Sequence, residues 1–244
     1  MTRLVFLHGF TQTHHHWHRP ADAVRRAVDP AATLAFVDLP GHGLAATDRT
    51  AISPAGPRLA ALGGAGAWVG YSMGARFALH AALSPGHSID RLVLIGATAG
   101  LSDPHERAVR VGDDEARARS IEADGLEPFL ERWLGAPLFA TLPPDPAAHQ
   151  RRLRNTAGGL AHSLRTAGTG NQESLWGRLG ELDLPVLCLA GELDTKFTTL
   201  GRQMADALPN GSFAAVPDAG HAAHTERPRA VADSIATWLR GPAG

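Results

Sequence analysis

The segment Gly70-Tyr71-Ser72-Met73-Gly74 is the feature that most constrains how this chain can fold. It has the pattern Gly-x-Ser-x-Gly, with an apolar run before it at 67–69 and a helix-like run after it at 75–83. A strand, a sharp turn and a helix are the context in which a serine hydroxyl is raised above the carboxyl edge of a sheet. The two glycines leave room where a side chain would clash with neighbouring backbone. The segment therefore predicts that Ser72 acts as a nucleophile or base.

Short apolar runs recur along the chain and predict the strands of a covered parallel sheet, because they are apolar on both faces. They lie at 3–7, 33–37, 67–71, 91–95, 185–189 and 212–216. Helix-like segments separate most of them, at 21–28, 55–62, 75–83, 200–208 and 229–239. This alternation predicts an α/β fold with a doubly wound, mostly parallel sheet and right-handed crossovers.

The alternation stops between Gly96 and Leu184. Helix-like segments at 104–122, 126–134, 147–153 and 159–165 surround a proline-rich joint at 142–146. An all-helical insertion between two strands predicts a lid over the carboxyl edge of the sheet, where ligands bind in such folds. We therefore expect a core formed by residues 1–96 and 185–244, and a helical lid (cap) formed by residues 97–184.

The formal net charge of -1 excludes a global field that would attract nucleic acid or an acidic membrane. The single cysteine, Cys188, cannot form an internal disulfide, and its apolar neighbours predict a buried strand residue. The first predicted strand starts too early to leave room for a leader, and no apolar run approaches the length needed to span a membrane. We expect a cytoplasmic protein that binds neither nucleic acid nor membrane.

A reactive serine needs a histidine, and that histidine needs an acid, in the chain order serine, acid, histidine. Asp194 is the expected acid because it closes the motif Gly191-Glu192-Leu193-Asp194 just after a predicted strand. Its alternative role is the N-cap of a helix that starts near Phe197. Glu192 and Asp183 are weaker candidates for the acid.

His221 is the expected histidine, because it lies on the loop that follows the last predicted strand at Val216. His224, three residues later, is the alternative. An oxyanion hole needs one backbone N–H beside the serine and a second from the loop after the first strand. Met73 supplies the first and Phe10 the second, while His8 is expected to be structural.

Two other histidine-containing segments are predicted to be structural. Asp38 and the residues up to Gly43 resemble a shaped turn in which the Asp38 carboxylate accepts backbone amides. Four histidines at 14–18 suggest a metal, but adjacent histidines in a loop cannot all face one ion, and no carboxylate or cysteine spacing completes a site. We therefore predict a surface loop there and no metal site.

With these motifs assembled, the chain resembles the α/β-hydrolase family, and within it the MenH-type 2-succinyl-6-hydroxy-2,4-cyclohexadiene-1-carboxylate synthases. The resemblance covers essentially the whole chain. General motifs match around Phe10, Asp38, Ser72, Asp194 and His221. The specific matches are Arg76, Lys196-Phe197, Glu106-Arg107 with Arg110 and Asp114, Trp133, and Gly168-Thr169-Gly170 with Gln172. Ala75 departs from the pattern, because the family usually has a second glycine there.

The resemblance implies an α/β-hydrolase fold and a lyase of menaquinone biosynthesis that needs no cofactor. Its substrate would be a cyclohexene with three carboxylates, from which it would eliminate pyruvate. Arg76, one helical turn beyond Ser72, and the lid arginines Arg110 and Arg152 would bind carboxylates through two-point contacts. Arg151 and Arg154 are close enough to Arg152 to compete for this role. Tyr71, Met73 and Trp133 would line the ring pocket.

Two other functions compete with this interpretation. A serine esterase or a C–C-bond hydrolase would use the same three residues, with Ser72 acylated, because one scaffold supports several reactions. An esterase for neutral substrates would have no use for Arg76 beside the serine. A non-catalytic receptor for small acids is disfavoured, since Ser72, Asp194 and His221 are all present in the expected order. The sequence leaves the oligomeric state, monomer or homo-oligomer, undetermined.

Overall fold

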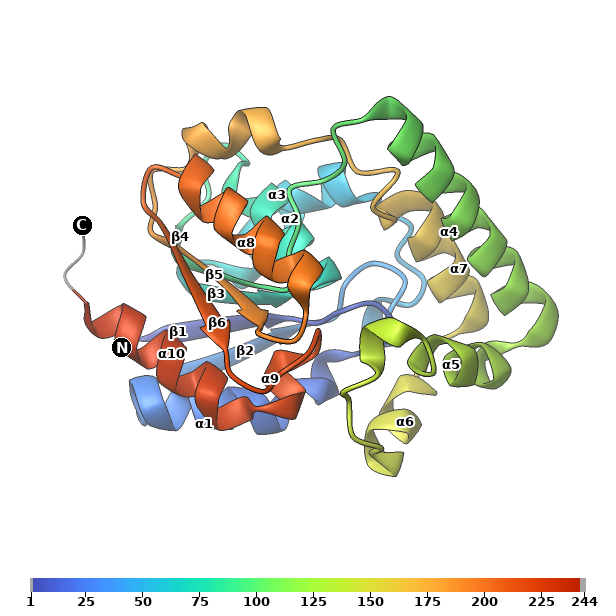
Figure 1. The fold of residues 1–244 in the computed structure, drawn as a ribbon, viewed down its shortest axis with the longest axis horizontal. Helices are drawn as coiled ribbons and strands as arrows, with labels where there is room; N and C mark the ends of the chain where they lie inside the picture. Colours follow the sequence, from blue (N-terminus) through green and yellow to red (C-terminus); the bar gives the residue numbers. More distant parts are fainter. Residues whose placement is uncertain (1, 242–244) are drawn as a thin grey trace.

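A six-stranded, all-parallel sheet lies at the centre of the computed structural model, which describes residues 2–241 (Figure 1). The strands are β1 (Arg3–Leu7), β2 (Thr33–Val37), β3 (Gly66–Tyr71), β4 (Ile89–Ile95), β5 (Val186–Gly191) and β6 (Gly211–Val216). Their spatial order is β2-β1-β3-β4-β5-β6, and every neighbouring pair is parallel. The predicted doubly wound sheet is confirmed, and each strand lies within two residues of its expected bounds.

The strand order reverses beside β1, with β2 on one side of it and β3 on the other. In doubly wound sheets, such a reversal opens a crevice at the carboxyl ends of the strands, where ligands bind. The loop after β1 begins at His8, and Ser72 directly follows β3. The topology therefore places the loop after β1, which carries Phe10, beside the turn that carries Ser72.

Helices cover both faces of the sheet (Figure 1). One face carries α1 (His18–Val28) and α10 (Pro228–Arg240), and the other carries α2 (Ile52–Gly63), α3 (Met73–Ala82) and α8 (Thr195–Ala207). Because side chains alternate along a strand, Leu4 and Phe6 join the first apolar cluster and Val5 and Leu7 the second. Cys188 is buried in the second cluster as predicted, and burial raises the pKa of its thiol to about 12.

The edge strands depart from the expectation that every strand is covered on both faces. Most residues of β2 and β6 are only half-buried, whereas β3 and β5 are buried throughout. The reason is positional, because β2 and β6 end the sheet and each has only one neighbouring strand.

Four helices between β4 and β5 form the inserted segment, which lies beyond the carboxyl ends of the strands (Figure 1). They are α4 (Pro104–Asp124), α5 (Leu126–Leu134), α6 (Pro146–Arg152) and α7 (Ala157–Ala167). Asp103, Asp145 and Thr156 cap α4, α6 and α7, each with a side-chain oxygen that accepts a backbone N–H. Ile121, Leu130 and Leu160 belong to a separate apolar cluster within this segment.

Several short elements were not predicted. They are α9 (Ala223–Glu226) and the 3-10 helices η1 (His14–His16), η2 (Gly43–Ala45), η3 (Pro137–Phe139) and η4 (Trp176–Glu181). Within residues 2–241, no helix is both long and apolar enough to pass through a bilayer.

Candidate active site

Ser72 occupies the sharp turn between β3 and α3, with φ 51° and ψ -109°. A positive φ is uncommon for a residue with a side chain and is held here by the surrounding backbone. The N–H of Ser72 donates to the carbonyl of Ile95 at 2.8 Å, and the N–H of Arg76 donates to the carbonyl of Ser72 at 3.2 Å. A Cβ on Gly70 would lie 2.6 Å from Ala75 Cα, so this turn requires the glycine.

Ser72, His221 and Asp194 form a continuous hydrogen-bonded chain. The Ser72 hydroxyl lies 3.1 Å from Nε2 of His221, and Nδ1 of His221 lies 2.7 Å from Oδ2 of Asp194. The side chains of His221 and Asp194 are buried. This arrangement can take a proton from the serine onto Nε2 and stabilise the resulting imidazolium.

Asp194 has two roles at once. Its Oδ2 holds His221, while its Oδ1 accepts the N–H of Phe197 at 3.3 Å and caps α8. The alternative that the sequence left open, an N-cap, is therefore present together with the histidine contact. The capping bond also fixes the carboxylate in place, because α8 begins at the next residue.

The residues that compete with Asp194 and His221 for the roles of acid and histidine lie away from Ser72. Glu192 is exposed and accepts the N–H of Asp218 at 3.4 Å. Asp183 is exposed before β5, at the opposite end of that strand from Asp194. His224 is fully buried, with its ring 4.1 Å from the ring of Tyr71, and burial lowers its pKa to about 3. His221 is therefore the histidine that can exchange a proton with Ser72.

A cavity lies above Ser72 between the core and the inserted helices. Phe10, Tyr71, Ser72 and Met73 line it from the core, together with Arg76 and His221. Arg110, Trp133 and Arg152 line it from the inserted helices. Of the residues that the sequence predicted for the site, only Asp194 does not line the cavity, because it lies behind His221.

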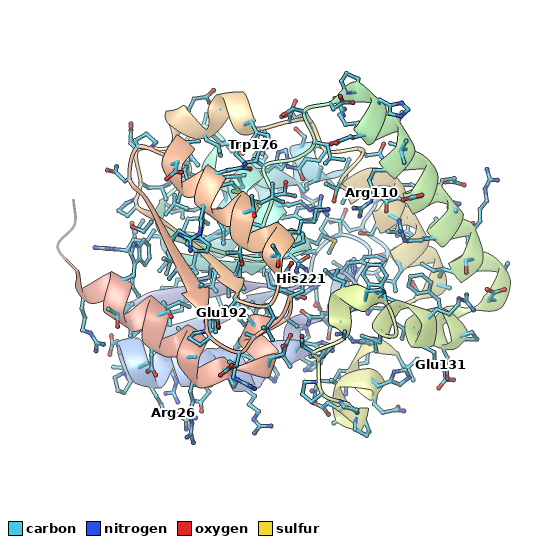
Figure 2. The ribbon with its side chains drawn as sticks, viewed as in Figure 1. Arg26, Arg110, Glu131, Trp176, Glu192 and His221 are labelled. Atoms are coloured by element: carbon cyan, nitrogen blue, oxygen red, sulfur yellow. The ribbon has the colours of Figure 1, made fainter. Side chains whose placement is uncertain are left out.

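The cavity is strongly cationic. Its lining includes Arg76, Arg110, Arg152 and Lys196, but no aspartate or glutamate from the part of the chain that the structure describes. Figure 2 shows Arg110 on α4 in the inserted segment and His221 on the core. The site therefore suits an anionic ligand with several charges.

Arg76 and Arg152 are buried guanidinium groups that contact neutral partners. Arg76 is 7% exposed and donates to the amide oxygen of Gln172 at 3.1 Å, and Arg152 is 5% exposed and donates to the hydroxyl of Thr11. Among residues 2–241, no carboxylate forms a salt bridge with either of them. Burial lowers the pKa of each to about 10, so both remain cations at neutral pH.

Arg110 differs from these two because it already has an anionic partner. Its Nε donates to both oxygens of Asp114, at 2.9 and 3.0 Å, and its side chain is 35% exposed. Asp114 itself is fully buried and also accepts from Arg117 at 3.2 Å. These contacts with Asp114 use only Nε, and Arg110 lines the cavity.

The structure distinguishes Arg152 from its neighbours in sequence. Arg151 is half-buried and lies 3.4 Å from Asp145, while Arg154 is exposed and donates to Nε2 of His15 at 2.7 Å. Of these three arginines, only Arg152 lines the cavity.

An aromatic wall closes one side of the cavity. The ring of Trp133 meets that of Phe10 edge-on, with centroids 5.3 Å apart, and Phe139 lies 5.6 Å from Trp133. The indole N–H of Trp133 is buried and has no hydrogen-bond partner among the described residues. The wall can therefore pack against the ring of a ligand.

Sequence reasoning missed several cavity residues. Phe139, Thr98 and Ser163 lie on loops or on helix faces that carry no motif. Gln12 could have been predicted from the sequence, because it directly follows the segment that contains Phe10. Its side-chain oxygen accepts the N–H of Gly9 at 3.0 Å and so holds this loop.

The loops behind the cavity agree with the predicted structural roles. His8 Nε2 accepts the N–H of Leu39 at 3.1 Å. The Asp38 carboxylate accepts the backbone N–H of His14 at 2.7 Å and that of Leu44 at 2.9 Å. These bonds tie the turn after β2 to the loop after β1, which carries Phe10.

The prediction of a surface loop at 14–18 is wrong, because these residues form η1 and the start of α1, and three of the four histidines come together there. One possible ligand atom from each of His14, His15 and His18 lies within 4.8 Å of the other two. The turn η1 and the start of α1 give these residues helical spacing, which places His18 beside both His14 and His15. His16 instead lies inward, with Nε2 3.2 Å from the carbonyl of Ala148.

Known proteins resemble this chain along most of its length. A family model described as the alpha/beta hydrolase family matches residues 4–234. A protein of Bacillus subtilis (strain 168), provisionally named 2-succinyl-6-hydroxy-2,4-cyclohexadiene-1-carboxylate synthase, is 40% identical over 176 residues, which is 70% of this chain and 64% of that protein. The synthase of that name from Klebsiella pneumoniae (strain 342) is 33% identical over 247 residues, covering 97% of this chain and 93% of the relative.

A solved structure agrees with these relatives. The structure of MenH from S. aureus superposes with a TM-score of 0.88 at 29% identity, covering 98% of this chain and 93% of that chain. The resemblance inferred from the motifs is thereby confirmed. The chain belongs to the alpha/beta hydrolase family, and proteins named as MenH-type synthases are its relatives within that family.

Proposed function

We propose that this protein is a carbon–oxygen lyase of menaquinone biosynthesis. It eliminates pyruvate from 2-succinyl-5-enolpyruvyl-6-hydroxy-3-cyclohexene-1-carboxylate and leaves 2-succinyl-6-hydroxy-2,4-cyclohexadiene-1-carboxylate. The names of the Klebsiella relative and of the S. aureus structure support this assignment. The proposed location is the cytoplasm, because the substrate is a small and highly charged metabolite.

The observation that carries the proposal is the pair of buried arginines that form no salt bridge with a carboxylate among residues 2–241. Arg76 and Arg152 line the same cavity as Ser72, and each donates to a neutral partner. A buried cation without an anion is costly, so this arrangement is best explained by a ligand that brings carboxylates. The proposed substrate has three, and Arg110 supplies a third arginine at the cavity wall.

In the proposed mechanism, Ser72 is the base. His221 takes the Ser72 proton onto Nε2, and Asp194 holds the opposite nitrogen of the ring. Ser72 then removes the ring proton at C2, the carbon next to the succinyl carbonyl. No acyl-enzyme forms, because the serine oxygen bonds to hydrogen and not to carbon.

The electrons of the broken C–H bond form a C2=C3 double bond, and the former C3=C4 pair moves to C4=C5. The C5–O bond breaks, and the leaving enolpyruvate takes up a proton and becomes pyruvate. Negative charge that develops on the succinyl oxygen is stabilised by the amides of Phe10 and Met73. Both residues line the cavity beside Ser72.

The inserted helices are proposed to act as a lid (residues 97–184) on the core (residues 1–96 and 185–244). The insertion has its own apolar cluster, to which Phe129 and Leu160 belong. It supplies Arg110, Trp133 and Arg152 to the cavity. Tyr71 and Trp133 are proposed to hold the ring of the substrate, while the arginines hold its carboxylates.

The test is pyruvate release from the proposed substrate, followed with a coupled NADH assay, beside hydrolysis of a short-chain p-nitrophenyl ester. We expect fast pyruvate release and negligible ester cleavage. Ester cleavage without pyruvate release would refute the lyase and favour a hydrolase. The variant Ser72→Ala in both assays shows whether either activity depends on this site.

A further inference from the structure

We propose that His14, His15 and His18 form a binding site for one divalent transition-metal ion of the Zn²⁺ or Co²⁺ type. None of the three lines the active-site cavity. They lie on η1 and at the start of α1, on the core. The site is therefore separate from the proposed lyase chemistry and does not depend on it.

Geometry is the first argument for this site. The candidate ligand atoms of the three imidazoles all lie within 4.8 Å of one another. A tetrahedral ion with metal–nitrogen bonds of about 2.0–2.1 Å needs nitrogens about 3.3 Å apart. Rotation of half-buried or exposed side chains can close this difference, and His14 and His15 are half-buried while His18 is exposed.

The Asp38 carboxylate orients the first ligand. Nδ1 of His14 donates to Oδ2 of Asp38 at 2.7 Å, and the backbone N–H of His14 donates to Oδ1 at the same distance. With its proton on Nδ1, His14 has a lone pair on Nε2, the form in which imidazole binds metals. A carboxylate behind a ligating histidine is the usual outer partner in zinc sites.

Arg154 competes with a metal ion for the side chain of His15. It donates to Nε2 of His15 at 2.7 Å, so metal binding through His15 must displace it. Arg154 is exposed and can move into solvent. Its positive charge also opposes a dication.

The donor set selects the class of metal. Three neutral imidazoles suit Zn²⁺, Co²⁺, Ni²⁺ or Cu²⁺, whereas Mg²⁺ and Ca²⁺ require oxygen ligands. The fourth position would be left to water, because the only carboxylate in contact with these histidines, among residues 2–241, is Asp38, which binds His14 from behind.

The experiment titrates Zn²⁺ and Co²⁺ into the full chain, prepared without a histidine tag and freed of metal by a chelator. Calorimetry gives the stoichiometry, and Co²⁺ absorption reports the coordination. We expect one ion per chain. The variant His18→Asn removes a metal ligand and should weaken binding by at least about 10–100-fold. Loss of a residue that only hydrogen-bonds to a ligand already weakens metal binding by that factor. The matched control His105→Asn removes an exposed histidine on α4 and should bind as the wild type does.

Arg154→Gln tests the competition directly. Loss of the guanidinium frees His15 and removes the repulsion, so Zn²⁺ should bind about tenfold more tightly. Absence of saturable binding at millimolar Zn²⁺ would overturn the proposal. Equal affinity in the wild type and His18→Asn would also overturn it, because the ion would then lie elsewhere.

Discussion

Mild acid should unfold this protein, because five of its buried histidines have lowered pKa values in the folded chain. His8, His16, His42, His80 and His224 are each at most 7% exposed. Burial is the main cause that lowers all five pKa values, to between about 2 and about 4. These histidines are therefore neutral in the fold, and protonation favours the unfolded chain.

The direction and the size of this destabilisation follow from the linkage between proton binding and folding. As the pH falls below about 6.5, the unfolded chain binds protons that the folded chain does not, so the free energy of unfolding falls with the pH. For a histidine with a folded pKa of about 4, such as His80, the loss is about 2 kcal/mol at pH 5 and about 3 kcal/mol at pH 4. Five such groups give about 10 kcal/mol at pH 5, which is comparable with the whole stability of a typical domain, about 5–15 kcal/mol.

His80 on α3 offers the sharpest test of this reasoning. Its Nε2 is buried without a hydrogen-bond partner among the described residues, and Arg76 and Arg178 add to the effect of burial on its pKa. The variant His80→Leu removes the titrating group, while any packing change affects stability equally at every pH. The stability of the variant relative to the wild type should therefore rise by about 2 kcal/mol between pH 8 and pH 5.

The assay is urea unfolding at pH 8 and pH 5, followed by tryptophan fluorescence and circular dichroism. His105→Leu serves as the control, because it removes an exposed histidine. The reasoning is refuted if the difference between His80→Leu and the wild type is the same at both pH values. It is also refuted if the wild type is as stable at pH 5 as at pH 8.

Two predictions concern the site itself. Ser72→Ala should lower kcat for pyruvate release by about 10²–10⁴-fold, the usual effect of losing a positioned proton-transfer group, and near-normal turnover would remove Ser72 from the mechanism. Arg152→Ala should cost about 2–5 kcal/mol in kcat/KM, because a substrate carboxylate loses its buried partner. Arg154→Ala, two residues along and exposed, should leave kcat/KM near the wild-type value, and equal losses in the two variants would contradict the role of Arg152.

The core part of the site could be predicted because it depends on local patterns. Ser72, Asp194 and His221 each follow a strand by no more than five residues. All strands are parallel, so their carboxyl ends share one edge and bring these residues together without knowledge of any other contact. The apolar strands and the Gly-x-Ser-x-Gly turn were enough to place them.

The lid part of the site depends on long-range packing. Arg151 and Arg152 are the last residues of α6, and Arg154 lies just beyond its end. Each step along a helix rotates a side chain by about 100°. The sequence could not say which of them faces the cavity, because that depends on how α6 rests on the core. The histidines at 14–18 were misjudged for a local reason, since the segment was treated as a loop although it forms η1 and the start of α1.

Arg76 shows how a site can weaken the fold that carries it. Burial lowers its pKa to about 10 from an ordinary 12.5. At neutral pH the charged side chain therefore destabilises the folded state by about 3 kcal/mol. Arg76→Met replaces the guanidinium by a shorter, unbranched apolar side chain and so removes the charge. We expect this variant to gain up to about 3 kcal/mol in stability and to lose most of its kcat/KM.

Urea unfolding and the pyruvate assay measure these two effects on the same protein samples. The variant Arg91→Met is the control, because Arg91 lies on β4 outside the cavity lining. A destabilised Arg76→Met would mean that Gln172 and the surrounding backbone compensate the buried charge within the protein. In that case Arg76 would not need a substrate carboxylate, and the argument for a polyanionic substrate would rest on Arg152 and Arg110 alone.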